Sequence, residues 1–399
     1  MNRRDRLIAR ARQGYRITYP CEGPDPRRFF AAPGRATLVG DFVEAQQGFV
    51  LSCAIDRETV VALSAGPEIG GRGYVEVVAI DEGRAMDKIA LYEPVIQAKD
   101  PWKNLVRGVV AALQQRGHCV LPARLSIAGD VPIRTDLASS SSFTVAVALA
   151  LTQISRISIS PGEMALVAWE AENDFLGSTC ALTDPMVSVS ATRGAALLLD
   201  CRSFEHMPIA VSADLAMVVI DSGVRPEVVR STLAKRRAEA DMAAKALGVE
   251  TLRDVSPETL EANKDAMTPD AYARARHVVD EIARVEPMAV ALAHGDTAAL
   301  AETMRASHAS LRDCYVVTVP MIDRLVDVVA HSLEAGGVPL GGVRMTGTSV
   351  SGQVIAVVQK DAVETVIDAV ETTYNPQADA PASATVYTMT GGAREITPT

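Results

Sequence analysis

The alternation of hydrophobic and polar residues predicts a β-rich first part of the chain. A short amphipathic helix is expected over residues 5–13, and segments with β-branched residues at alternate positions follow it. Four short strands are therefore expected before the next helix. They cover residues 35–39, 49–55, 58–64 and 73–79.

Helical spacing begins at residue 102, where Leu105, Val109 and Leu113 recur on one face of a helix over residues 102–115. In the rest of the chain, segments with helical spacing and segments with strand-like alternation follow one another in irregular order. Further helices are expected at 143–153, 164–173, 226–246, 271–294, 297–311, 320–335 and 362–373, and further strands at 125–128, 195–200, 215–221, 354–358 and 385–390.

This order of elements favours an α+β fold with two halves of similar size over a regular βαβ alternation. We expect an N-terminal domain over residues 1–208 and a C-terminal domain over residues 209–399, with the linker near residues 201–213.

Composition narrows the class of protein. The chain has 399 residues, of which 48% are hydrophobic and 22% charged, which excludes a disordered, collagen-like or small disulfide-bonded protein. Its longest apolar stretch, residues 143–151, is far shorter than the roughly 20 residues of a membrane span. The six cysteines are scattered, so we expect reduced thiols in a soluble, cytoplasmic protein. A net charge of −10 makes nucleic acid an unfavourable partner.

Residues 132–142, PIRTDLASSSS, run directly into an apolar helix. Unpaired N–H groups at a helix N-terminus attract phosphate, and small residues let it approach closely. Ser139 and Ser140 could also reach a metal ion on that phosphate. An ordinary cluster of N-capping serines remains the alternative.

Two further stretches have the same ambiguity. Residues 341–352, GGVRMTGTSVSG, suit either a tight turn or a second loop facing phosphate. Arg35 follows Pro33 and Gly34 at the edge of an expected strand, where it could serve a site or form a surface ion pair.

Taken together, these stretches resemble the GHMP small-molecule kinases, and within that family the galactokinases. The resemblance runs from about residue 32 to residue 374, with the three loops in the family's order. The segments that carry it are 32–56, 102–110, 170–184, 199–203, 307–313, 318–320 and 341–347.

The resemblance implies a two-domain fold, with a ribosomal-S5-like N-terminal domain and a ferredoxin-like C-terminal domain around the active site. It also implies transfer of a phosphoryl group from ATP, with Mg²⁺, to a hydroxyl of a small molecule such as a sugar or cyclitol. Such a reaction needs positioned phosphates, a metal ion and an oriented hydroxyl. Neither a membrane nor nucleic acid would be a partner, and the protein would be a monomer or a homodimer.

Roles in the site follow from the same resemblance. Asp184 would accept the proton of the attacking hydroxyl or orient it, and Arg35 would keep Asp184 ionised and stabilise the transferring group. Ser140 would meet Mg²⁺. The nucleotide would be bound by Trp102, Arg134, Leu137, Ala138, Ser139, Ser140, Ser141 and Gly347.

The chain departs from the galactokinase pattern where that family binds the sugar. The family's Gly-Glu-His-Thr-Asp-Tyr continues here as Asp41, Phe42, Val43, Glu44 and Ala45 after Gly40. Its sugar-contacting Tyr falls at Leu233, and the Gly before the catalytic Asp falls at Ala181. The substrate-binding candidates are therefore Asp41, Phe42, Glu44, Ala181 and Leu233.

These replacements favour an acceptor with fewer hydroxyls than galactose, phosphorylated at the position equivalent to the anomeric carbon to give a 1-phosphate. Two other interpretations stay open. One is a galactokinase with a divergent site. The other is a catalytically impaired sensor or binding protein, because glycines of the family's loops are replaced. The family's Gly-x-Gly-Leu is RTDL here, at residues 134–137, and its Gly-Gly-Gly-Phe-Gly-Gly is GTSVSG, at residues 347–352.

Overall fold

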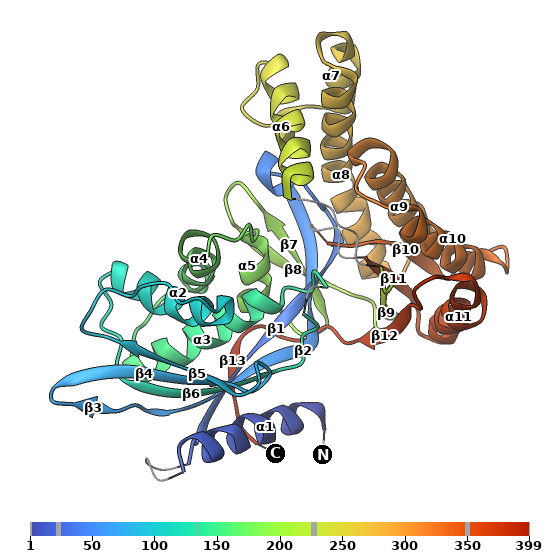
Figure 1. Cartoon of the computed structure of the whole chain (residues 1–399). Coiled ribbons are helices and arrows are strands. Elements are labelled where there is room, and N and C mark those ends of the chain that lie inside the picture. The colour runs from blue at the N-terminus through green and yellow to red at the C-terminus, as the bar shows by residue number, and fades with distance from the viewer. Residues whose placement is uncertain (1, 21–24, 134, 225–229, 348–351, 399) are drawn as a thin grey trace.

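A computed structural model describes residues 2–20, 25–133, 135–224, 230–347 and 352–398. Over these residues the chain forms a nine-stranded sheet and a four-stranded sheet. Figure 1 shows the larger sheet with the N-terminal helices and the smaller one with the C-terminal helices. In the part of the chain that is described, no helix combines the length and apolar character needed to cross a membrane.

The larger sheet is built around two long antiparallel strands, β1 (Arg28–Val39) and β2 (Phe49–Ala65). The first half of β2 pairs with β7 and its second half with β6, so two groups of strands extend from one strand. Strand β4 pairs with β6 in parallel. The remaining bounds are β3 (Glu68–Ile69), β4 (Arg72–Ala79), β5 (Ala85–Ala90), β6 (Ala123–Gly129), β7 (Ala195–Asp200), β8 (His206–Ala210) and β13 (Arg394–Ile396).

Helices cover both faces of this sheet (Figure 1). On one side α2 (Pro101–Gln115), α3 (Ser139–Ser155), α4 (Pro161–Glu170) and α5 (Thr183–Ser190) enclose an apolar core. On the other side α1 (Arg3–Thr18) buries Leu7, Ile8 and Ala11 against β1 and β2.

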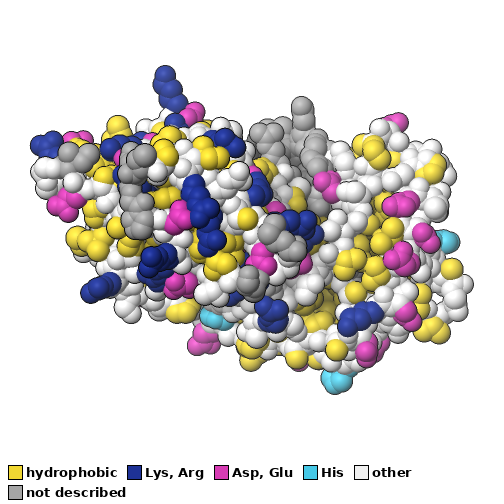
Figure 2. Space-filling model, turned by 90° about the horizontal axis from the view of Figure 1, so that it is seen from below, with side chains coloured by type: hydrophobic (Ala, Val, Ile, Leu, Met, Phe, Trp, Pro, Cys, Tyr) yellow, Lys and Arg dark blue, Asp and Glu magenta, His cyan; other side chains and the backbone are white. Residues whose placement is uncertain are grey.

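Ion pairs reinforce the attachment of α1. Arg3 pairs with Asp130 at 2.5 Å, and Arg10 pairs with Asp81. Figure 2, seen from below, shows basic and acidic side chains interspersed over this face. The arginines of α1 thus serve the packing of the helix on the sheet.

The smaller sheet has the order β10-β11-β9-β12, with all pairs antiparallel. Its strands are rich in Val and Ile, and helices pack on it to bury a second core. The helices and strands of this part of the chain are β9 (Leu215–Asp221), α6 (Arg230–Ala246), α7 (Pro257–Ala262), α8 (Pro269–His294), α9 (Thr297–Ser310), α10 (Pro320–Glu334), β10 (Gly341–Met345), β11 (Gln353–Gln359), α11 (Val363–Asp368) and β12 (Ser383–Tyr387).

The predicted helices and strands are found with shifted ends, and three expectations need correction. The expected linker at 201–213 contains β8, which pairs with β7. The expected strands at 49–55 and 58–64 form one strand, β2, because the bend between them keeps its pairing with β1 through a register shift. Residues 341–345, expected in a loop, form β10. The chain also returns to the first sheet through β13, which pairs with β1. The division between residues 208 and 209 stays a prediction.

Candidate functional site

A buried ion pair joins β1 to the first turn of α5. The Nε and Nη2 atoms of Arg35 each lie 2.7 Å from Oδ1 of Asp184, and Arg35 is only 2% exposed. The Nη1 atom of Arg35 donates to the carbonyl oxygen of Asp136 at 2.8 Å. The structure therefore brings together the two residues that the sequence predicts as catalytic.

Neighbouring carboxylates stabilise the positive charge of Arg35. Burial alone lowers the pKa of Arg35, but the carboxylates of Asp184, Asp136 and Asp41 outweigh burial and raise it above its ordinary value. A guanidinium fixed in this way costs no reorganisation when negative charge develops beside it.

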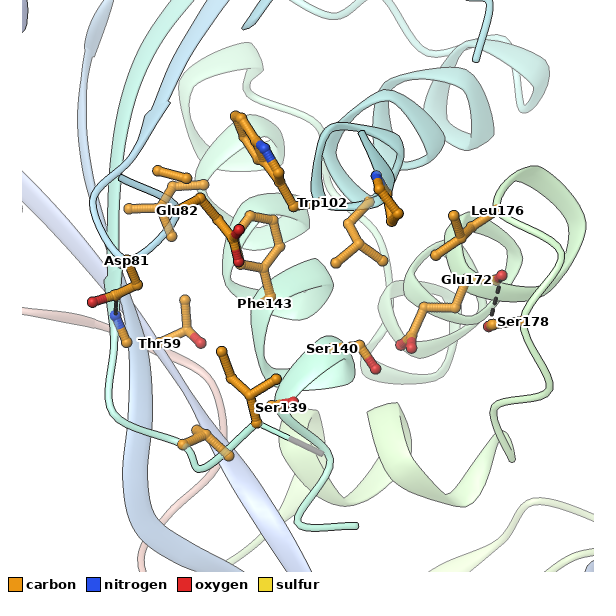
Figure 3. Close-up of a pocket in the computed structure, with 17 residues that line it drawn as sticks. Thr59, Asp81, Glu82, Trp102, Ser139, Ser140, Phe143, Glu172, Leu176 and Ser178 are labelled. Carbon is orange, nitrogen blue, oxygen red and sulfur yellow. Dashed lines mark hydrogen bonds between the residues drawn. The ribbon is translucent and has the colours of Figure 1, made fainter. Parts of the chain in front are cut away.

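A pocket of about 290 Å³ lies between the large sheet, α2 and the start of α3. Figure 3 shows its two ends: Trp102 and Phe143 lie at one, and Ser139, Ser140 and Glu172 lie at the other. Ser139 and Ser140 are the first two residues of α3, so the N–H groups of its first turn adjoin the pocket. The serine end of the pocket suits phosphate groups, and the aromatic end suits a nucleotide base.

The loop before α3 is held in an unusual backbone shape. Asp136 and Ala138 have positive φ angles of 57° and 56°, a region that residues other than glycine seldom adopt. The buried Leu137 accepts the Arg35 N–H through its carbonyl oxygen at 3.0 Å. A Cβ atom on Gly347 would lie 2.5 Å from Oδ2 of Asp136, so this loop touches the end of β10. Of the predicted nucleotide-binding residues, Arg134 lies outside the described residues.

Glu172 is a site residue that the sequence does not single out. The residue is 2% exposed, and its carboxylate accepts the Ser141 hydroxyl at 2.7 Å. Burial raises its pKa, and hydrogen bonds from Ser140 and Ser141 oppose that rise. The only signal in the sequence is its place in the segment 170–184, where Glu170 and Asp174 are equally acidic.

Ser140 and Glu172 could together hold Mg²⁺. Their side-chain oxygens face each other in Figure 3, and oxygen donors are the ligands that Mg²⁺ prefers. Within the described residues, no group of three or more His, Cys, Asp or Glu side chains could hold a metal ion. A metal ion carried by a nucleotide needs only one or two protein ligands, so the donor set fits that role.

Cys180 links this end of the pocket to the ion pair. Its Sγ atom lies 3.3 Å from the Ser141 hydroxyl and 3.8 Å from Oδ2 of Asp184. The Asp184 carboxylate also raises the pKa of Glu172. The phosphate end of the pocket therefore adjoins Asp184. Cys180 is one of five free cysteines in the described part of the chain, as expected for reduced thiols.

Asp41 is fully buried and bound by a second arginine. Its Oδ2 accepts Nη2 of Arg344 at 2.5 Å, while its Oδ1 has no hydrogen-bond partner among the described residues. Burial raises the pKa of Asp41, Arg344 opposes that rise, and the buried Glu281 adds to it. Because Asp41 is fully buried, its unpaired oxygen is enclosed by the protein.

Phe42 and Leu233 are the two large apolar residues among the predicted substrate-binding candidates. Phe42 has a φ of 64° and stacks on Tyr315, with ring centroids 4.7 Å apart. Both Phe42 and Leu233 pack against the core of the smaller sheet.

Glu44 lies at the start of a short 3₁₀ turn, Glu44–Gln46. Burial raises its pKa to about 7, with smaller contributions from Asp41 and Asp184. Ala181, the remaining substrate candidate, accepts the Asp184 N–H at 3.1 Å through its carbonyl oxygen and so fixes the turn before α5.

The raised pKa of Glu44 predicts a pH-dependent effect on stability. Between the ordinary pKa of 4.5 and the folded value of about 7, the folded state binds more protons than the unfolded state, so this group makes folding less favourable as pH rises. Glu44→Gln removes this loss of stability at high pH, because the amide does not titrate. We expect the Tm of the variant relative to wild type to be about 1–3 °C higher at pH 8 than at pH 5. An equal difference in Tm at the two pH values would contradict the assignment.

Three family profiles match the chain. Residues 104–192 match the profile described as GHMP kinases N terminal domain, and residues 288–376 match GHMP kinases C terminal. Residues 15–65 match the galactokinase galactose-binding signature. The first of these covers Ser140, Glu172 and Asp184, and the last covers Arg35.

Solved structures share the fold over nearly the whole chain. Lactococcus lactis galactokinase complexed with galactose has a TM-score of 0.89 at 24% identity, covering 98% of this chain and 100% of that one. Methanococcus jannaschii mevalonate kinase has a TM-score of 0.61 at 16% identity, covering 93% and 100%. Homoserine kinase from Cytophaga hutchinsonii has a TM-score of 0.57 at 17% identity, covering 94% and 99%. The expected two-domain α+β fold is confirmed.

Proposed function

Because the chain belongs to the GHMP kinases, we propose that it transfers the γ-phosphate of ATP to a hydroxyl of a sugar or sugar-like cyclitol. The product would be a 1-phosphate, formed at the position equivalent to the anomeric carbon. The observation that carries this proposal is the buried Arg35–Asp184 pair beside the phosphate end of the pocket.

The reaction assigns a simple task to each side chain. The acceptor oxygen attacks the γ-phosphorus as the bond to the oxygen of ADP breaks, and the hydroxyl proton passes to Asp184. Arg35 orients Asp184 and stabilises negative charge on the transferring group. Mg²⁺, when bound at Ser140 and Glu172, would neutralise charge on the phosphates.

The acceptor would have fewer hydroxyls than galactose. The side chains of Phe42 and Leu233 offer no hydrogen bond, so a hydroxyl placed against either would lose its partners in water. Glu44 and Asp41 are the polar members of the proposed substrate-binding set, and they would bind polar groups on the rest of the ring.

ADP release with a panel of acceptors tests this substrate preference. We expect kcat/KM for deoxysugars or unsaturated cyclitols to exceed that for galactose by about 10- to 100-fold, since each unpaired polar group costs roughly 1–3 kcal/mol. Phe42→His should reduce this difference in kcat/KM, because the imidazole gives a galactose hydroxyl a hydrogen-bonding partner. Asp184→Asn is the control for background ATP hydrolysis.

Two other outcomes would redirect the proposal. Galactose turned over as well as any deoxy acceptor would favour a galactokinase with a divergent site. A protein that binds acceptor or nucleotide without forming phosphate ester would favour an impaired sensor. One observation points towards that sensor: the Asp136 carboxylate lies at the Gly347 loop, where it would oppose a triphosphate.

A further inference from the structure

The second acidic residue of the β4–β5 turn gives the pocket a chemical preference at its aromatic end. We propose that the Glu82 carboxylate accepts a hydrogen bond from the exocyclic amino group of the adenine base. This inference rests on the proposed function, in which the pocket binds ATP.

The orientation of the nucleotide follows from the two ends of the pocket. Phosphates belong at Ser139 and Ser140, where α3 begins and Glu172 lies nearby. The base then lies at the other end, where Trp102 and Phe143 supply aromatic surface. Figure 3 shows Glu82 at this end, with its carboxylate beside the Phe143 ring and below Trp102.

Glu82 is the carboxylate at this pocket that is free to bind a ligand. Among the described lining residues there are three acidic side chains and no Lys or Arg. Asp81 accepts the Gly129 N–H at 2.7 Å and pairs with Arg10, and Glu172 accepts the Ser141 hydroxyl. No described residue forms a hydrogen bond or ion pair with the Glu82 carboxylate.

The chemistry of a carboxylate decides which group it can contact. An ionised carboxylate only accepts hydrogen bonds. Adenine presents one donor on its edge, the exocyclic amino group, beside ring nitrogens that accept. The apolar walls formed by Leu105, Ile127 and Leu176 leave that amino group few other partners. Glu82 lies in a turn whose next two residues, Gly83 and Arg84, have φ of 67° and 61°, which carries the chain back into β5.

Calorimetry with two nucleotides tests the contact. The dissociation constants of Mg-ATP and Mg-purine riboside triphosphate, which lacks the amino group, are measured for wild type, Glu82→Ala and Glu82→Gln. We expect wild type to prefer ATP by about tenfold. Glu82→Ala should remove this preference by weakening ATP alone, whereas Glu82→Gln, which keeps a carbonyl acceptor, should retain most of it. Glu68→Ala, at an exposed glutamate outside the pocket, is the matched control.

A ribose contact is the competing explanation, and 2′-deoxy-ATP and 3′-deoxy-ATP distinguish it. If Glu82→Ala weakens ATP and purine riboside triphosphate equally, but leaves one of the deoxy nucleotides unaffected, Glu82 binds the ribose and the inference is overturned. It is also overturned if ATP binds all variants equally. Failure of wild type to bind any nucleotide at several millimolar would instead overturn the proposed function, and this inference with it.

Discussion

Asp184→Asn is expected to lower kcat for phosphoryl transfer by about 1,000-fold while changing the affinity for Mg-ATP by less than about threefold. An amide cannot take the proton of the attacking hydroxyl. Its oxygen can still accept from the Nε atom of Arg35, which lies 2.7 Å from Oδ1 in the wild-type protein. The change therefore removes the base and keeps most of the local geometry. ADP release and calorimetry measure the two effects separately.

Stability provides the control for this variant. Breaking a buried ion pair on one side costs about 3–5 kcal/mol when the remaining charge has no partner. Arg35 keeps the carbonyl oxygen of Asp136 as an acceptor, so Asp184→Asn should still fold at 25 °C. A folded variant that keeps more than about a tenth of the wild-type kcat would remove Asp184 from the chemical step.

Glu172→Gln is expected to raise the Mg²⁺ concentration needed for half-maximal activity by about 10- to 100-fold. The carboxylate is buried beside the Ser140 and Ser141 hydroxyls, so its replacement removes negative charge from the place where a cation would sit. Ser140→Ala should also raise the required Mg²⁺ concentration, but by a smaller factor, because a neutral hydroxyl is a weaker ligand than a carboxylate. Initial rates are measured against Mg²⁺ at fixed ATP.

Glu170→Gln is a matched control in the same segment. Its carboxylate pairs with Arg116, away from the lining of the pocket. The control variant should keep the wild-type Mg²⁺ dependence. If Glu170→Gln and Glu172→Gln shift that dependence equally, the effect reflects the fold of the segment and not a metal ligand.

The periodic helices and the central strands could be predicted from sequence because their apolar positions repeat. Strands β8 and β13 could not, since each is short and depends on a partner strand far along the chain or across a hairpin. The joining of two expected strands into β2 has the same cause. Its pairing with β1 persists across a bend that looks like a break in the local pattern.

Some residues of the site could be predicted from the sequence, and others could not. Arg35 and Asp184 lie in motifs that resemble a known family, and the structure brings them within hydrogen-bond distance. Glu172 cannot be singled out from the sequence, because Glu170 and Asp174 lie two residues away on either side. The π-helical turn at Ala171–Phe175 decides which of the three faces the serines. The stacking of Phe42 on Tyr315 depends on a positive φ that its residue type does not favour.

Phosphorus NMR of the products tests the central claim most directly. Wild type and Asp184→Asn are each incubated with Mg-ATP and a mixture of deoxysugars and cyclitols, and the spectra are compared. The account predicts a new phosphomonoester signal, equal in amount to the ADP formed, with wild type alone. ADP that appears only with inorganic phosphate, or a phosphomonoester formed equally by Asp184→Asn, would contradict it.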